Sequence, residues 1–143
     1  MDDVDQKILA LLARNARMTV KEIAAKVSLT SPAVSDRIHR LEHEGAIAGY
    51  TVVLGEKLQP GRIDALISIS VPPASREEFL QLAQSRPGVT QCFHVTGSYS
   101  FILKVACSDI AALEHLINRL QRYGQTSSQI ILSTPVDRRG MPL

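Results

Sequence analysis

The sequence predicts an α+β protein, in which a cluster of three helices is followed by a sheet of four strands with two helices. Two periodicities lead to this prediction. Up to Gly45 apolar residues recur at three- and four-residue spacing, as in amphipathic helices, whereas after Gly61 they alternate every second residue, as in half-buried strands. Gln59, Pro60 and Gly61 interrupt regular structure between the two regions. We therefore expect a first domain over residues 1–60 and a second over residues 61–143.

The first helix is expected to begin at Asp3 as its cap and to carry one apolar face, formed by Val4, Ile8, Leu11 and Leu12. Three helices are the smallest cluster that buries three such faces. This helix should therefore cover the two that follow.

The second helix has a start signal of its own. Thr19 and Glu22 predict a capping box, in which the hydroxyl accepts a first-turn N–H and the carboxylate accepts the N–H of the cap. The helix would begin near Val20 and end near Ser28. Its narrow apolar face consists of Ile23, Ala24 and Val27.

The third helix follows a very short turn and is expected to open with Ser31-Pro32, an oxygen acceptor followed by a residue without an N–H. Gly45 would end it in the left-handed conformation. Its buried stripe is Val34, Ile38 and Leu41, and its opposite, polar face holds Pro32, Asp36, His39, Arg40 and His43. Two capped helices and a tight turn predict a helix-turn-helix.

The second helix of a helix-turn-helix lies in the major groove of DNA, and its first residues contact base edges. Arginine side chains suit guanine or phosphate, because a guanidinium is a planar fork of donors. The predicted DNA-binding residues are Thr19, Lys21, Ser31, Pro32, Ala33, Ser35, Asp36, Arg37, His39 and Arg40. The alternative is an ordinary helical hairpin, in which Asp36–Arg40 and Arg40–Glu44 are weak surface pairs.

Charge alone argues weakly for DNA binding. The chain carries a formal net charge of +2, and residues 1–50 contain seven Lys or Arg and seven Asp or Glu. Binding would require the basic residues to gather on one side and a dimer to double the contact area. The residues expected on that side are Arg14, Arg17, Lys21, Lys26, Arg37 and Arg40.

A short linking strand is expected over Ala46 to Leu54, which is rich in Ile, Tyr, Thr and Val. With this strand the first domain would be a three-helix winged helix-turn-helix.

The second domain is expected to contain four strands and two helices. A strand over 63–71 ends at Pro72-Pro73, and a capping box of Ser75 and Glu78 opens a helix that ends at Pro87-Gly88. Strands over 89–96 and 100–107 surround Gly97-Ser98-Tyr99, Ser108 or Asp109 caps the next helix, and residues 127–133 form the last strand. The order βαββαβ predicts a ferredoxin-like domain. Its uncovered sheet face is apolar at Leu66, Ile102 and Ile131, which predicts a partner subunit.

The composition is that of a soluble globular protein, with 45% hydrophobic and 21% charged residues in 143. The sequence has neither an apolar run near 18 residues nor a secretory signal, so we expect a cytoplasmic protein without a membrane partner. Cys92 and Cys107 fit buried thiols better than a disulfide, although their redox state stays open.

The sequence resembles the Lrp/AsnC (feast/famine) transcriptional regulators over nearly its full length. The resemblance is carried by Asp3-Val4-Asp5 with Ile8-Leu9, by residues 19–27, by Ser31-Pro32, by residues 37–42 and by Gly45-Ala46-Ile47. It implies a nucleoid-associated regulator of double-stranded DNA, and homodimers that assemble into octamers or other higher oligomers. It also implies that an amino acid is sensed between the second domains.

By this resemblance, an effector site would involve Thr96, Gly97, Ser98, Tyr99, Ser100, Thr126 and Ser128. The family often carries acidic residues where this chain has Ser98 and Ser100. Without them an amino acid loses a charge-assisted contact with its ammonium group, so the effector is expected to differ, to bind weakly or to be absent. A tight hairpin turn without any ligand is the equal alternative.

Other chemistry is less favoured. His39 and His43 lie one helical turn apart but lack a third metal ligand, and Cys92 with His94 fits a core thiol beside a hydrogen-bonded histidine. No cofactor motif is present, and we expect neither a metal site nor an enzyme. Two alternatives to a sequence-specific regulator stay open: an architectural, chromatin-like protein that wraps DNA without an effector, and a ferredoxin-like enzyme acting on a small molecule.

Overall fold

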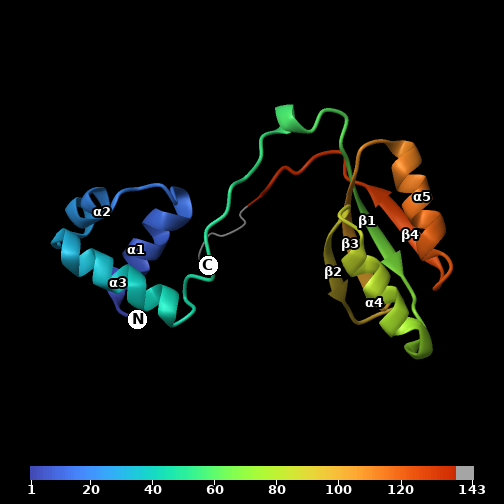
Figure 1. The fold of residues 1–143 in the computed structure, drawn as a ribbon, viewed down its shortest axis with the longest axis horizontal. Helices are drawn as coiled ribbons and strands as arrows, with labels where there is room; N and C mark the ends of the chain where they lie inside the picture. The colour runs from blue at the N-terminus through green and yellow to red at the C-terminus, as the bar shows by residue number, and fades with distance from the viewer. Residues whose placement is uncertain (138–143) are drawn as a thin grey trace. The chain divides into compact units, whose positions relative to one another are not determined.

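The computed structural model describes residues 1–137 and confirms the α+β class. The chain divides into two compact units, which consist chiefly of residues 1–53 and 54–135 (Figure 1). The domain boundary expected near residue 60 stays a prediction.

The first unit is a three-helix cluster of α1 (Asp3–Arg14), α2 (Val20–Val27) and α3 (Ser31–His43). Each helix contributes to one core, as the apolar spacing predicts. The fully or almost fully buried apolar residues are Ile8, Ile23, Ala24, Val34 and Leu41.

The caps of α1 and α3 lie one residue earlier than predicted. Asp2, not Asp3, caps α1, because its carboxylate accepts the N–H of Asp5 at 2.8 Å while the Asp5 carboxylate accepts the N–H of Asp2 at 3.0 Å. Thr30, not Ser31, caps α3 by accepting the N–H of Ala33 at 3.4 Å. In both helices the predicted cap is already the first residue with helical geometry.

The remaining helix ends of this unit follow the prediction. Thr19 and Glu22 form the capping box of α2, with the Thr19 N–H donating to the Glu22 carboxylate at 2.7 Å. Ser28 ends α2 in the left-handed region at φ 57°, and Gly45 follows α3 at φ 74°.

The predicted linking strand is absent. Residues 46–54 contain no strand, and a 3-10 turn, Glu56–Leu58, lies at the start of the second unit, before its first strand. A strand needs a neighbour for its backbone hydrogen bonds, and no described strand pairs with this segment. Most of its apolar side chains consequently face outward, with Val52 81% exposed, whereas Ile47 is partly buried against the core of the first unit.

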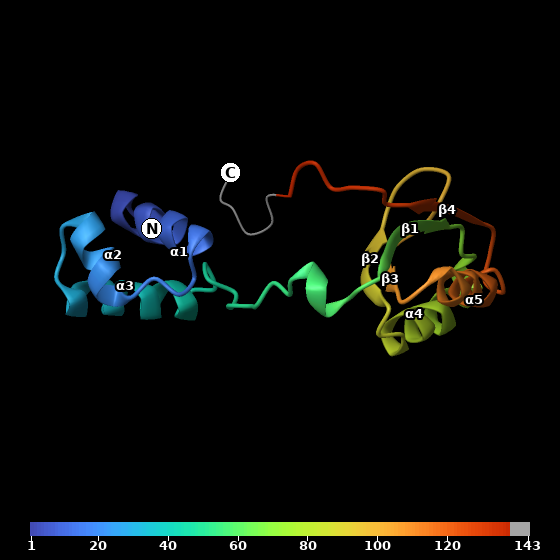
Figure 2. The same ribbon diagram turned by 90° about the horizontal axis from the view of Figure 1, so that it is seen from above.

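The second unit has the predicted βαββαβ order. Its elements are β1 (Ile63–Ile69), α4 (Arg76–Ser85), β2 (Val89–His94), β3 (Phe101–Cys107), α5 (Ile110–Leu120) and β4 (Thr126–Ile130). The strands lie in the order β2-β3-β1-β4, and all neighbours are antiparallel. Figure 2 shows α4 and α5 on the same face of this sheet.

Alternate residues of β1 and β3 face the helices and form the core, in which the rings of Phe79 and Phe101 lie 5.0 Å apart. The register places Leu66 opposite Lys104 and Ser68 opposite Ile102 on the other face, where both apolar side chains are partly exposed. An apolar, uncovered sheet face is therefore present, as predicted.

The predicted capping box of Ser75 and Glu78 is wrong. Residues Pro73–Ser75 form a 3-10 turn, so Ser75 has helical rather than extended geometry and its side chain makes no capping hydrogen bond. The Glu78 carboxylate instead accepts a hydrogen bond from the hydroxyl of Tyr123 at 3.2 Å. At the other helix, Asp109 rather than Ser108 is the cap of α5, since its carboxylate accepts the N–H of Ala112 at 2.7 Å.

The prediction of two buried thiols is right for Cys107 and wrong for Cys92. Both cysteines are free thiols. Cys92 points to the helix side of the sheet, as does Leu103 opposite it, but β2 is an edge strand that α4 covers only in part, so Cys92 is exposed.

Candidate nucleic-acid interface

The exposed surface of α3 begins at the first turn of the helix. Ala33 and Ser35 are partly buried beside the core, and the exposed residues in this helix include Ser31, Pro32, Asp36 and His39. Thr19 and Lys21, at the start of α2, are also exposed. The structure thus leaves the N-terminal half of α3 accessible, which a helix that reads base edges requires.

Arg37 and Arg40 do not extend freely from this surface. Nη1 of Arg37 lies 2.7 Å from Oδ2 of Asp2 and 2.7 Å from Oδ1 of Asp5, and Nη2 of Arg40 lies 2.9 Å from Oδ2 of Asp5. The side chain of Asp5 is only 1% exposed. We call these four residues the α1–α3 ion-pair cluster.

The cluster shifts the pKa values of Asp2, Asp5 and Arg37. The backbone N–H of Asp5 and then the Arg37 guanidinium lower the pKa of Asp2 to about 2. The N–H of Asp2, followed by Arg37 and Arg40, lowers the pKa of Asp5 as well, and hydrogen bonds to Asp2 and Asp5 raise the pKa of Arg37. Asp2 and Asp5 are therefore ionised at neutral pH, and their two negative charges offset the formal charges of the two arginines.

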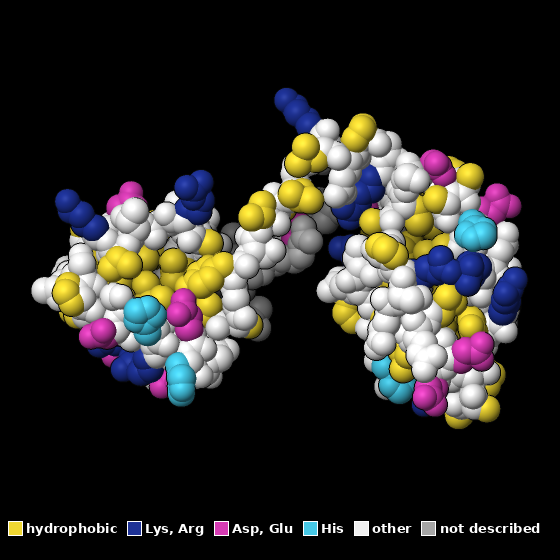
Figure 3. All heavy atoms as spheres, in the orientation of Figure 1, with side chains coloured by type: hydrophobic (Ala, Val, Ile, Leu, Met, Phe, Trp, Pro, Cys, Tyr) yellow, Lys and Arg dark blue, Asp and Glu magenta, His cyan; other side chains and the backbone are white. Residues whose placement is uncertain are grey.

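The acids and arginines of this cluster have matching spacing in the sequence, although spacing alone does not identify them as partners. Two acids three residues apart at the start of α1 match two arginines three residues apart in α3, and each pair lies on one helical face. The remaining basic residues of the predicted set are exposed and have no ion pair within residues 1–137: Arg14, Arg17, Lys21 and Lys26. On the face of this unit visible in Figure 3, basic, acidic and histidine side chains are mixed.

The predicted effector residues lie around the end of β1. Ile69 of β1 pairs with Phe101 on one side and with Thr126 on the other, so the hairpin loop and the start of β4 flank the same strand end. Ser128 pairs with Ile67, two residues further along β1. The structure therefore brings the two halves of the predicted effector site to one end of the sheet.

Ser100 is held by backbone groups within this site. Its Oγ accepts the N–H of Val71 at 2.8 Å and lies 3.3 Å from the Ile69 carbonyl oxygen, to which it donates. Ser98 differs, since its carbonyl accepts a hydrogen bond from Ser70 Oγ at 2.9 Å while its own hydroxyl has no hydrogen bond in the described chain. Gly97, at φ 110°, provides the turn.

Thr126 and the residues just before it make close contacts with neighbouring groups. The Gln121 side-chain amide donates to Thr126 Oγ1 at 3.2 Å. A Cβ on Gly124 would lie 1.7 Å from the carbonyl oxygen of Ser70, so only glycine allows this close approach. Thr96 is exposed and Tyr99 is partly buried in the hairpin loop.

The histidine and cysteine pairs remain separate from these sites. His39 and His43 are exposed, and among residues 1–137 no three His, Cys, Asp or Glu side chains gather as metal ligands would. His94 is exposed, and its ring stacks on Phe101 at 4.7 Å, which corrects the prediction of a hydrogen-bonded histidine beside a core thiol. None of the helices in the described part is long and apolar enough to cross a membrane.

Comparison with known proteins agrees with this architecture. The model of the AsnC-type helix-turn-helix domain matches residues 1–42, and that of the Lrp/AsnC ligand binding domain matches residues 64–141. The HTH-type transcriptional regulator YezC of Bacillus subtilis is 34% identical over 94% of this chain and 95% of its own.

Solved structures are similar over nearly the whole chain. A transcriptional regulator of Neisseria meningitidis, crystallised with L-Met, is 27% identical, has a TM-score of 0.90 and matches 99% of this chain and 96% of its own. Escherichia coli AsnC is 30% identical, with a TM-score of 0.85, and the match covers 96% of this chain and 95% of the AsnC chain.

Proposed function

This chain belongs to the Lrp/AsnC family of transcriptional regulators, and we propose that it binds duplex DNA through the exposed N-terminal half of α3. The observation that carries the proposal is the accessibility of Ser31, Pro32, Asp36 and His39 on one helix that follows a tight turn. Donors and acceptors at this position reach base edges in the major groove. Arg14, Arg17, Lys21 and Lys26 then serve as the phosphate contacts.

Arg37 and Arg40 have a different role in this proposal. Their guanidinium groups pair with Asp2 and Asp5, so they fix α3 against α1 before DNA arrives. Arg40 is 48% exposed and Arg37 is 25% exposed, and carboxylates hold both guanidinium groups. We therefore expect Arg40→Ala to weaken DNA binding through a looser α3.

We propose a homodimer, assembled through the uncovered face of the sheet, as the DNA-binding form. Residues 1–53 have no net formal charge, and two copies of the helical cluster double the number of phosphate contacts on a symmetric site. The partly exposed Leu66 and Ile102, with Phe93 45% exposed beside Ile102, give that face an apolar surface. Octamers or other higher assemblies, a place at the nucleoid and the absence of a catalytic role belong to the same proposal.

An amino acid or related small molecule is the proposed effector, at the end of β1 beside Ser98 and Thr126. Support comes from the relative of known structure that was solved with L-Met, and from the register that joins the two loops. Ser98 offers a free hydroxyl, whereas the hydroxyl of Ser100 is held by the backbone. Calorimetry with the free amino acids tests this part, and unchanged affinity in Ser98→Ala would remove Ser98 from the site.

DNA affinity measured against salt concentration tests the main proposal. We expect a steep loss of affinity with salt, and His39→Ala should weaken binding to genomic fragments relative to random competitor DNA. His43→Ala is the matched control, because His43 is exposed on the same helix but lies one turn further from its N-terminus. Absent or salt-independent binding contradicts the proposal, and equal affinity for genomic and random DNA would favour an architectural protein.

A further inference from the structure

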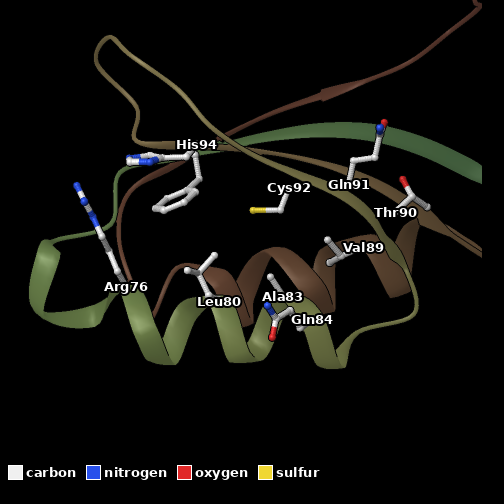
Figure 4. Close-up of a pocket in the computed structure, with 10 residues that line it drawn as sticks. Arg76, Leu80, Ala83, Gln84, Val89, Thr90, Gln91, Cys92 and His94 are labelled. Carbon is white, nitrogen blue, oxygen red and sulfur yellow. The ribbon is translucent and has the colours of Figure 1, made fainter. Parts of the chain in front are cut away.

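A groove lies between α4 and the edge strand β2, on the helix side of the sheet (Figure 4). We call it the α4–β2 groove. Its volume of about 490 Å³ lies within the usual range of small-molecule pockets. None of the residues proposed for the DNA interface or for the effector site at the end of β1 lines it.

Helical and strand periodicity explain the lining. Leu80 and Ala83 follow Arg76 on one face of α4, at spacings of four and seven residues. On β2, Cys92 and His94 alternate toward the helices. Figure 4 shows Arg76 and His94 at one end of the groove, while Leu80 and Ala83 lie along its floor.

The lining of the groove carries positive charge at one end, from Arg76. Arg76 has no ion pair within residues 1–137, and its Nε is buried without a hydrogen-bond partner. No Asp or Glu among residues 1–137 lines the groove, and the neighbouring Glu78 is hydrogen-bonded to Tyr123. The Arg76 guanidinium as a whole has no ion pair in the described residues, so its charge would stabilise an anion at this end of the groove.

The polar ends and the apolar floor together define a ligand class. We propose that the α4–β2 groove binds a small monocarboxylate with an apolar tail, whose carboxylate accepts hydrogen bonds from Arg76 and whose tail lies on Leu80 and Ala83. An amino acid fits less well, because its ammonium group would find no carboxylate in the lining. This binding does not depend on the proposed DNA interface or on an effector at the hairpin loop.

Cys92 provides a direct probe, because it lines the groove and is exposed, whereas Cys107 is 9% exposed and serves as an internal reference. Partial burial raises the pKa of the Cys92 thiol, so alkylation with iodoacetamide is run at about pH 9, with modification followed by mass spectrometry. Octanoate is the test ligand, and octylamine has the same tail with the opposite charge. We expect octanoate to slow Cys92 alkylation saturably, octylamine to give weaker protection, and Cys107 to stay unmodified.

Two variants test the contacts. Arg76→Gln should weaken protection by octanoate about tenfold or more, while Arg122→Gln, which removes an exposed arginine outside the groove lining, should leave it unchanged. Leu80→Asp places a carboxylate on an exposed part of the floor and should also abolish protection. The proposal is overturned by absent protection, by equal protection with octylamine, or by full protection in Arg76→Gln. It is also overturned if Cys92 of the native protein is already unreactive without ligand, because a second copy would then cover the groove.

Discussion

Removing the hydroxyl of Ser100 distinguishes a structural role of this residue from a ligand-binding role. In the Ser100→Ala variant the N–H of Val71 loses its acceptor, which lies at 2.8 Å in the native protein. The Ile69 carbonyl oxygen keeps its bond from the backbone N–H of Ser100 at 3.0 Å, whereas the Val71 carbonyl oxygen also loses its long contact of 3.5 Å with the Ser100 hydroxyl. An unsatisfied backbone donor in a partly buried site costs about 1–3 kcal/mol. We therefore expect Ser100→Ala to destabilise the second unit by about 1–2 kcal/mol.

Urea unfolding followed by circular dichroism measures this change, with the free energy of unfolding obtained by linear extrapolation. For a domain of this size, 1 kcal/mol corresponds to a shift in melting temperature of about 4–8 °C. Ser98→Ala is the matched control, because it removes a hydroxyl without a partner from the same loop. Equal midpoints for Ser100→Ala and the native protein would refute the reasoning, as would a destabilised Ser98→Ala.

Three further perturbations test the fold around both sites. Thr19→Ala removes the acceptor of the Glu22 N–H at 3.2 Å and should cost about 1 kcal/mol in thermal unfolding, whereas Thr19→Ser should restore most of it. The pKa of Asp2 is about 2 in the folded chain and 3.8 ordinarily, so its stabilising contribution is present above pH 3.8 and is lost as the pH falls toward 2. Asparagine still caps the helix but does not titrate, so the stability of Asp2→Asn, followed by circular dichroism, should depend less on pH in this range. Gly124→Ala would place a Cβ 1.7 Å from Ser70 and should lower the melting temperature by several degrees, while Gly55→Ala, with open space around it, should change it little.

The helices and strands of this chain were predictable where a local pattern decides the structure. Thr19 and Glu22 form a capping box because the backbone of Thr19 is extended. Ser75 and Glu78 have the same spacing but form no capping box, because the prolines before Ser75 impose a 3-10 turn. The prediction of a linking strand was wrong for a related reason. Strand propensity reflects how side chains pack on a sheet, and residues 46–54 have no described strand beside them.

The exposed face of the third helix was predictable from its period, but the partners of its arginines were not. Arg37 and Arg40 are 32 and 35 residues from Asp5, and only the packing of α1 on α3 brings these groups within 3 Å. The groove beside Cys92 escaped prediction because the alternation of β2 indicates which side a residue faces and not whether a helix covers it.

The α1–α3 ion-pair cluster changes the expected salt dependence of DNA binding. Of the six basic residues assigned to the DNA-facing side, Arg37 and Arg40 are paired internally, and Arg14, Arg17, Lys21 and Lys26 remain. Each neutralised phosphate contributes about −0.9 to the slope of log affinity against log salt, so a dimer that uses these four residues on each protomer has a slope near −7.

A dimer that used all six would have a slope near −11, which requires Asp2 and Asp5 to release their partners on binding. Affinity measured from about 50 to 200 mM salt distinguishes the two cases. Lys21→Ala should reduce the magnitude of the slope by about 2 per dimer, whereas Arg37→Ala should lower stability and leave the slope near −7. A slope near −11 in the native protein that falls in Arg37→Ala would mean that Arg37 exchanges its carboxylates for phosphate, and the fixed position of α3 would then be a property of the free protein alone.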